Sequence, residues 1–261
     1  MFKANVDGVE IHYQRLGKGE PVVFLHGLGE IKEGWAFQHE LADEYDLIIP
    51  DLRGHGESTT TDGITLENFA IDVLNLLDYL GIETAHICGL SMGGVVAQEI
   101  YRLAPERCRS LMLVSTFYYF PRTFGTYYYY LRKHRALNLT SDQQRELSAR
   151  TCLYSWNEEL KDTFLKSYKP NKEAYLKSME ACLHVNNISL VQKIAVPTLV
   201  IGGQYDAVTP IWIQIAMHKR IPNSKLVIFK DAGHITKLEV ADQFNQTVRK
   251  FLASQQEQAV S

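Results

Sequence analysis

Cys88-Gly89-Leu90-Ser91-Met92-Gly93-Gly94 is the segment that decides the fold of this chain. A short apolar run at 85–88 precedes it and a helical pattern at 95–100 follows it. The spacing Gly-x-Ser-x-Gly between the two predicts a sharp turn from a strand into a helix. Glycine has no Cβ and permits the close backbone approach that such a turn requires. The turn would present Ser91 as an exposed nucleophile, with the backbone N–H of Met92 as a donor to an oxyanion. The alternative is a Ser/Gly turn that only caps a helix.

Size and composition are those of a globular chain with one large core and room for an insertion. Of its 261 residues, 46% are hydrophobic and 22% charged, and the formal net charge is −3. This charge gives no reason to expect nucleic acid or an anionic membrane as a partner. No N-terminal apolar stretch is long enough for a secretion signal, and polar residues interrupt every later apolar run. The four cysteines are scattered without a C-x-x-C pair, so we expect a reduced, cytoplasmic protein.

Apolar runs alternate with helical patterns over most of the chain, which predicts a mostly parallel sheet flanked by helices. The first two runs flank Asp7-Gly8 and alternate in polarity, as in a hairpin. Several later runs are continuously apolar, as expected of strands that are covered on both faces. Eight strands are predicted, at 2–6, 9–14, 21–26, 46–50, 85–88, 110–114, 197–202 and 225–229.

This alternation stops between 117 and 191, where we predict no strand. The segment has helical patterns near 127–136, 141–153, 158–168 and 172–185, and it is crowded with aromatic residues. We therefore predict an all-helical cap over 117–191, inserted after the sixth strand, and an α/β core formed by 1–116 and 192–261. Within the core we expect an amphipathic helix from about Gly34 to Tyr45, and another that begins at Thr65.

A general base for Ser91 is expected in a loop at the carboxyl end of a strand. A serine hydroxyl is a poor nucleophile at neutral pH, so it requires a base. Among nine histidines, His234 directly follows the last predicted strand, and such loops of a parallel sheet converge on one crevice. His26 and His55 lie in similar loops, but each adjoins glycine, and we expect both to support loop structure.

The acid that orients the base is assigned to Asp206. It follows the strand at 197–202, from where it can hydrogen-bond the imidazole of His234 and fix its tautomer. The chain order Ser91, Asp206, His234 is the order expected after a turn of the type Gly-x-Ser-x-Gly. Asp231 and Asp51 are the rivals. We expect Asp231 to hold its loop and Asp51 to pair with Arg53 or with nearby backbone N–H groups.

A second oxyanion donor is expected from the loop after the third strand, His26-Gly27-Leu28-Gly29. The backbone N–H of Leu28 is the candidate, paired with that of Met92. This assignment depends on loop position, and the alternative is a glycine turn without a catalytic role.

Together these motifs resemble the α/β-hydrolase fold family over nearly the whole chain. The motifs are HGLG at 26–29, DLRGHGES at 51–58, GLSMGG at 89–94, Asp206, and Gly-His at 233–234. The chain is most similar to small capped carboxylesterases and enol-lactonases, whose helical cap occupies the position predicted here. Serine at position 91 excludes the carboxylate nucleophile of the family's dehalogenases and epoxide hydrolases. Ile235 stands where its carbon–carbon bond hydrolases usually carry tryptophan and its hydroxynitrile lyases lysine.

The resemblance implies a serine hydrolase that cleaves small to medium carboxylic esters or lactones through an acyl-enzyme. We expect no metal or organic cofactor, because no His/Cys/Asp cluster has ligand spacing. The aromatic cap favours an apolar pocket and an uncharged acyl or aryl ester. Thioester or carbon–carbon bond hydrolysis stays open, as does a small-molecule receptor on the same scaffold with slow or single turnover. We expect a monomer or a homodimer.

Overall fold

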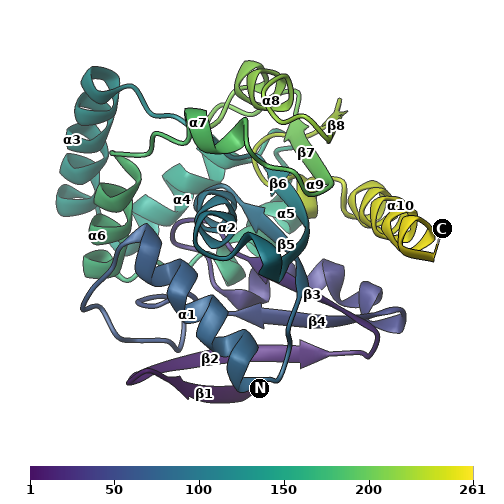
Figure 1. The fold of residues 1–261 in the computed structure, drawn as a ribbon. Helices are drawn as coiled ribbons and strands as arrows, with labels where there is room; N and C mark the ends of the chain where they lie inside the picture. The colour runs from purple at the N-terminus through teal and green to yellow at the C-terminus, as the bar shows by residue number, and fades with distance from the viewer. Residues whose placement is uncertain (261) are drawn as a thin grey trace.

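The computed structural model describes residues 1–260, apart from the side chains of 122–124 and 257–260. Ser261, the last residue of the predicted core, therefore lies outside the described residues. One eight-stranded sheet organises the molecule, in the spatial order β1-β2-β4-β3-β5-β6-β7-β8 (Figure 1). The strands are β1 (Phe2–Val6), β2 (Val9–Leu16), β3 (Glu20–Leu25), β4 (Tyr45–Pro50), β5 (Ala85–Leu90), β6 (Cys108–Val114), β7 (Thr198–Gly203) and β8 (Ser224–Phe229).

Strand direction confirms the predicted mostly parallel sheet. β2 runs antiparallel to both of its neighbours, β1 and β4, and every other neighbouring pair in the sheet is parallel. The carboxyl ends of β3 to β8 therefore lie along one edge, where a parallel sheet places its ligand crevice.

Helices cover both faces of the sheet, and alternate strand residues face opposite ways. Ile87 of β5 packs with α1 (Leu66–Tyr79), α2 (Met92–Leu103) and α8 (Ile211–His218) on one face. Cys88 belongs to the core on the other face, with the 3₁₀ helix η1 (Lys32–Asp43) and α10 (Ala241–Val260). Two short helices, η2 (Pro105–Arg107) and α9 (Thr236–Glu239), complete this part of the chain. The sheet is thus buried between two helical layers, as predicted.

The helix expected at 34–45 was predicted with the wrong geometry and bounds. The segment is the 3₁₀ helix η1, which ends at Asp43, and Tyr45 already begins β4. Its buried side chains recur every third residue, at Lys32, Trp35, Gln38 and Leu41. Because a 3₁₀ helix has three residues per turn, this spacing places all four on one face. The prediction for Thr65 is confirmed: its hydroxyl caps α1 by accepting a hydrogen bond from the backbone N–H of Asn68.

Five helices fill the segment predicted as a cap, and no named strand lies there among the described residues. In Figure 1, α3 and α6 lie side by side at the left of the sheet. The exact division into core and cap stays a prediction. The bounds are α3 (Arg122–Asn138), α4 (Ser141–Cys152), α5 (Glu158–Ser167), α6 (Lys172–Cys182) and α7 (Ile188–Val191).

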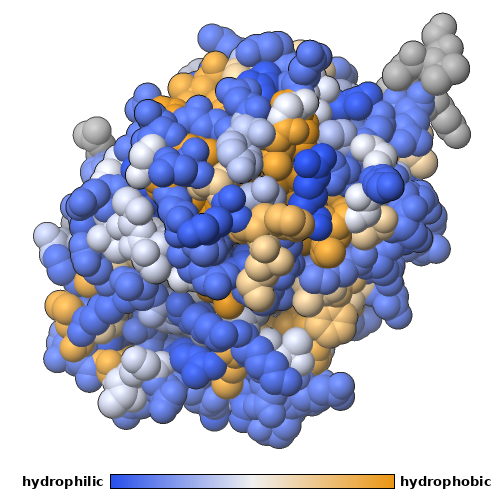
Figure 2. Space-filling model, turned by 90° about the horizontal axis from the view of Figure 1, so that it is seen from below, coloured by the Kyte–Doolittle hydropathy of each residue, from blue (hydrophilic) through white to orange (hydrophobic). Residues whose placement is uncertain are grey.

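The surface seen from below the view of Figure 1 is largely hydrophilic. Apolar side chains form separate patches on this face (Figure 2). No helix within residues 1–260 is long and apolar enough to cross a membrane.

Candidate active site

Ser91 stands at the turn between β5 and α2 with an unusual backbone conformation. Its φ is 53° and its ψ is −116°, a region that side-chain-bearing residues rarely occupy and that costs free energy. Its N–H donates to the carbonyl of Val114 at 2.9 Å, and the Thr116 hydroxyl donates to its carbonyl at 2.6 Å. These contacts with the end of β6 hold the strained turn, and they leave the Ser91 side chain partly exposed.

The flanking glycines are required by space. A Cβ added to Gly89 would lie 2.2 Å from the carbonyl oxygen of Gly93. One added to Gly93 would lie 2.4 Å from the carbonyl oxygen of Leu25 at the end of β3. Real Cβ atoms do not approach backbone oxygens so closely, so any side chain here would force the turn away from β3. The sequence pattern Gly-x-Ser-x-Gly thus has a steric cause in this fold.

Asp206 and His234 are brought together from the loops that follow β7 and β8. The Nδ1 atom of His234 lies 2.8 Å from Oδ2 of Asp206, and both side chains are buried. Because an ionised carboxylate only accepts, Nδ1 carries the proton and Nε2 has a free lone pair. The hydroxyl of Ser91 makes no hydrogen bond to either residue within residues 1–260.

The carboxylate of Asp206 is held by its own loop as well as by His234. Its Oδ1 accepts from the backbone N–H groups of Val208 and Thr209, each at 2.8 Å, and its Oδ2 accepts from the Thr209 hydroxyl at 2.8 Å. Burial alone would raise the pKa of Asp206, but the charge and hydrogen bond of His234, together with Thr209, lower it. The group therefore stays ionised and orients the imidazole.

The loop that carries Leu28 lies directly against Ser91. A Cβ added to Gly27 would be 3.5 Å from Cβ of Ser91. Within the described residues, the backbone N–H of Leu28 donates to no protein group. The N–H of Met92 belongs to the first turn of α2, which has no side-chain cap. Both N–H groups are thus available to an acceptor beside Ser91.

His26 supports this loop, as the sequence predicted. Its Nε2 accepts from the backbone N–H of Leu52 at 3.0 Å, so its Nδ1 is the protonated nitrogen and donates to the carbonyl of Gly27 at 2.9 Å. Burial lowers the pKa of His26, which keeps the ring neutral. The ring of His55 lies tilted against it, with centroids 5.0 Å apart, and is also buried, which lowers its pKa to about 3. Neither ring is available as a general base.

A buried ion pair lies beneath the same loop. Oε1 of Glu30 is 3.1 Å from Nζ of Lys237, and both side chains are almost fully buried. The other oxygen, Oε2, accepts from the backbone N–H of Gly27 at 2.9 Å. Burial would raise the pKa of Glu30, but Lys237 and the Gly27 N–H outweigh it and lower the pKa. The loop therefore contains an ionised carboxylate close to Ser91.

The helical segment between β6 and β7 contacts both loops of the site. The backbone of Ile31 donates to Ser167 at 3.0 Å, and Lys169 donates to Gly29 at 2.9 Å. The ring of Tyr168 lies against Gly29, where a Cβ would be 2.8 Å from Cε2. The position of the Leu28 loop thus depends on the end of α5.

The histidine loop is held in a similar way. The backbone N–H of His234 donates to the carbonyl of Cys152 at 2.8 Å. The carboxylate of Glu239 accepts from the backbone N–H groups of Gly233 at 2.8 Å, Tyr154 at 2.7 Å and Ser155 at 2.9 Å. Glu239 therefore joins the histidine loop to the residues that follow α4.

Sequence reasoning missed Thr209, Glu239 and the pair of Glu30 with Lys237. Glu239 follows His234 by five residues, and this closeness in sequence to the predicted base was the available signal for a role in holding the histidine loop. Neither rival forms a hydrogen bond or an ion pair with His234 within the described residues. Asp51 accepts from backbone N–H groups, as expected, but its ion pair is with Lys32 at 2.8 Å and not with Arg53, which pairs with Asp72. Asp231 is exposed and forms no ion pair within residues 1–260.

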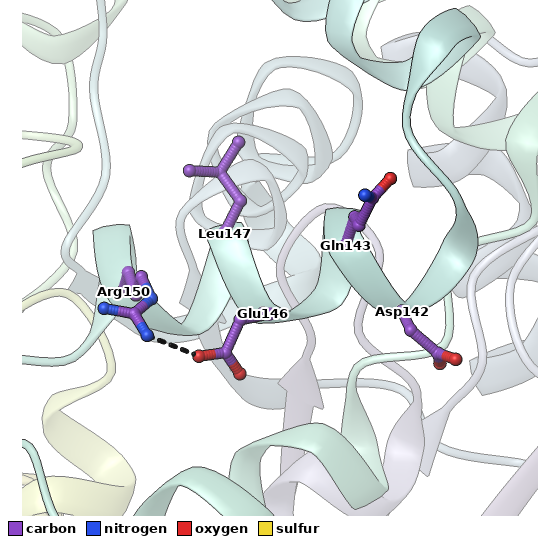
Figure 3. A pocket seen from close by; sticks show the side chains of 5 residues that line it. All are labelled: Asp142, Gln143, Glu146, Leu147 and Arg150. Atoms are coloured by element: carbon purple, nitrogen blue, oxygen red, sulfur yellow. Dashed lines mark hydrogen bonds and ion pairs between the residues drawn. The ribbon is translucent and has the colours of Figure 1, made fainter.

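A hollow on the outer surface lies outside this site. This hollow of about 440 Å³ on α4 is lined by Asp142, Gln143, Glu146, Leu147 and Arg150 (Figure 3). The side chain of Asp142 is 94% exposed, and no candidate residue lines the hollow, so it is a depression of the outer surface. No group of three His, Cys, Asp or Glu side chains in the described part of the chain could hold a metal ion.

Comparisons with known proteins agree with this architecture. The sequence model of the family described as alpha/beta hydrolase fold matches residues 20–240. The chain is 32% identical over 262 residues to the dihydrolipoyllysine-residue acetyltransferase component of the acetoin cleaving system from Pseudomonas putida, covering 96% of this chain and 68% of that protein.

Two solved structures are closely similar over their full length. An esterase from Thermogutta terrifontis has a TM-score of 0.90 at 27% identity, covering 97% of this chain and 98% of that one. The enol-lactonase from Burkholderia xenovorans LB400 has a TM-score of 0.89 at 27% identity, covering 96% of this chain and 99% of that one.

Proposed function

Because the chain belongs to the α/β-hydrolase family, as its motifs predicted, we propose that it is a serine hydrolase for small to medium carboxylic esters or lactones. Ser91 is the nucleophile, His234 the general base and Asp206 the residue that orients it. The observation that supports this most is the contact between His234 and Asp206, which joins two loops at the sheet edge where Ser91 stands. Similarity to an esterase and an enol-lactonase supports the substrate class.

The reaction is acyl transfer to water. Nε2 of His234 takes the proton of the Ser91 hydroxyl as Oγ attacks the carbonyl carbon. The carbonyl oxygen becomes an oxyanion that accepts hydrogen bonds from the N–H groups of Leu28 and Met92. Collapse breaks the bond to the leaving alkoxide, which receives the proton from His234. Water then attacks the acyl-enzyme as His234 takes its proton. The bond to Oγ of Ser91 breaks, Oγ recovers the proton from His234, and the carboxylic acid leaves.

This proposal is tested with 4-nitrophenyl esters of increasing acyl length and a set of lactones, assayed with the unmodified chain and with Ser91→Ala. We expect turnover by the unmodified chain and a loss of about three orders of magnitude or more in Ser91→Ala. A fluorophosphonate probe should label Ser91 and no other serine, with Ser141→Ala, an exposed serine at the start of α4, as the matched control. Labelling of Ser91→Ala equal to that of the control would contradict the proposal.

The same assay separates the receptor hypothesis from turnover. A receptor with a reactive serine would release one equivalent of 4-nitrophenol per chain and then stop. Sustained release over many equivalents supports the hydrolase. A matched series of oxygen esters and thioesters then ranks the substrate classes by kcat/KM.

A further inference from the structure

The buried pair of Glu30 and Lys237 requires an explanation, since charges are rarely buried without a purpose that offsets desolvation. The exposed fraction of the whole residue is 2% for Glu30 and 1% for Lys237. The pair joins two distant parts of the chain: Glu30 lies in the loop after β3, and Lys237 lies three residues after His234. It therefore connects the loop of the oxyanion donor to the helix that follows the base.

Glu30 fixes Gly27, the residue that precedes the donor residue Leu28. Its carboxylate accepts from the N–H of Gly27 at 2.9 Å, and its own N–H donates to the carbonyl of Gly27 at 3.2 Å. With both polar atoms of Gly27 engaged, the next N–H, that of Leu28, has a fixed direction. This arrangement places a carboxylate very near the chemistry: a Cβ built on Gly27 would be 3.2 Å from Oε2 of Glu30 and 3.5 Å from Cβ of Ser91.

An uncompensated carboxylate at that position would oppose catalysis. Negative charge develops on the substrate oxygen in the transition state, and a second negative charge a few ångströms away in a protein interior repels it. Lys237 supplies the opposite charge. Its ammonium group also donates to the carbonyl of Gly34 and lies 4.5 Å from the ring centroid of Trp35. Within residues 1–260 it forms an ion pair with no acid other than Glu30.

We propose that Glu30 and Lys237 are a positioning pair for the oxyanion hole: Glu30 orients the Leu28 N–H through Gly27, and Lys237 cancels the charge that Glu30 would place beside the oxyanion. This inference rests on the proposed function, because it requires an oxyanion at Leu28 and Met92. It predicts that the charge of Lys237 matters only while Glu30 is ionised.

The protonation of Glu30 can be followed by measuring activity as a function of pH, because the neighbouring titratable groups keep one protonation state over the range used. Three buried titratable side chains, those of His26, Cys88 and Cys152, act on the pair. Burial lowers the pKa of His26, raises that of Cys88 and raises that of Cys152 to about 12. Because Nε2 of His26 accepts a hydrogen bond from the backbone N–H of Leu52, that ring is neutral, and thiols with a raised pKa stay protonated between about pH 6 and pH 8.

The experiment compares the unmodified chain, Lys237→Met, and the double variant Glu30→Gln with Lys237→Met, using one neutral 4-nitrophenyl ester. In Lys237→Met we expect kcat to fall by about 10- to 100-fold, the effect of one unscreened charge at this range. KM should change little, since a neutral ester carries no charge before the transition state. The deficit should shrink as pH falls from about 8 to 6, because a buried Glu30 without its lysine takes up a proton. In the double variant, kcat should return to within about threefold of the unmodified chain at all pH values.

Lys32→Met is the matched control. Lys32 is equally buried and pairs with Asp51 at 2.8 Å, but it has no contact with Gly27. It should lower stability by a similar amount and leave kcat and its pH profile unchanged. A double variant that folds yet is as slow as Lys237→Met would overturn the proposal, as would an equal and pH-independent loss in the control. Failure of the proposed function gives a different result, since Ser91→Ala would then be as active as the unmodified chain.

Discussion

Replacing Glu239 by alanine tests how firmly the histidine loop depends on the helical segment above it. The carboxylate accepts three backbone hydrogen bonds, from Gly233 beside the histidine and from Tyr154 and Ser155 after α4. Alanine removes all three at once without adding bulk. Among the described residues, no other side chain accepts hydrogen bonds from the N–H groups of both segments.

The size of the effect follows from the exposure of these donors. The N–H of Gly233 is buried, and leaving it unpaired costs about 1–3 kcal/mol. The residue Tyr154 is 45% exposed, so its N–H and that of Ser155 regain water, and their loss costs about 0.5–1 kcal/mol each. Release of a partly buried carboxylate from its desolvated site offsets some of this cost. We expect a net loss of about 2–3 kcal/mol in the free energy of unfolding.

The sign of the pH dependence is fixed by the pKa of Glu239, which burial raises despite its three donors. The folded state therefore binds the proton of the Glu239 carboxyl more tightly than the unfolded state does. This stabilises the folded state at pH values below the unfolded pKa, and the stabilisation is lost as pH rises through the raised pKa of the folded state. The difference in unfolding free energy between the unmodified chain and Glu239→Ala should therefore be larger near pH 4.5 than near pH 8.

Urea denaturation followed by tryptophan fluorescence measures this difference, and ester turnover measures the position of His234. We expect kcat/KM to fall by about tenfold or more, since misplacement of a catalytic group lowers the rate steeply. Glu146→Ala is the control, because its exposed pair with Arg150 should contribute less than about 1 kcal/mol. Unchanged stability and kcat/KM in Glu239→Ala would refute the assignment of Glu239 as the link between the two segments.

Three other substitutions have defined outcomes. Gly93→Ala should prevent the turn from forming, because the added Cβ would lie 2.4 Å from the carbonyl oxygen of Leu25. Soluble yield and phosphonate labelling should both fall. A stable variant that is still labelled would contradict the steric argument. Asp206→Asn should lower kcat by about 10³- to 10⁴-fold, because an amide does not hold His234 in the required tautomer. It should also remove stability that the lowered pKa of Asp206 supplies above about pH 4 and that is lost on acidification, which denaturation curves at pH 3 and pH 7 will measure. Arg132→Met should lower the melting temperature and reduce the rate of neutral-ester turnover by less than threefold, because the guanidinium donates to phenol hydroxyls of the helical segment and to no carboxylate within residues 1–260; a larger loss of turnover would place Arg132 in the site.

Local sequence signals predicted the sheet and the turn at Ser91 because both depend on neighbouring residues. The continuous apolar runs have one stable arrangement, a sheet covered on both faces. Gly89 and Gly93 are required because an added Cβ would lie only 2.2 Å and 2.4 Å, respectively, from backbone oxygens of the turn and its neighbouring strand. The pairing of Asp206 with His234 was predictable for a related reason, since parallel strands that end at one edge bring their loops together.

The helix at 32–43 shows where this reasoning fails. We read the pattern as an α-helix, although periods of 3.0 and 3.6 residues drift apart by about 240° over twelve residues. Packing against β4 selects the tighter form, in which Trp35 and Leu41 face the core. Contacts between distant segments also could not be predicted from the sequence. No spacing in the sequence links Glu30 to Lys237, which are neighbours only in the folded chain.

The attachment of the helical segment explains why the fold could be predicted more fully than the substrate. This segment holds the Leu28 loop through Ile31 and Lys169, and the histidine loop through Cys152 and Glu239. A change in its packing should therefore move the proposed oxyanion donor and the proposed base together, and reshape the space between them. Selection for a new substrate can act through the helices alone while Ser91 and its partners stay unchanged, which is how one family accommodates many substrates. For this chain the specificity should follow the helical segment: exchanging 117–191 for that of a related esterase should transfer the acyl preference. Ser91→Ala should abolish activity both in this chain and in the chimera built on it.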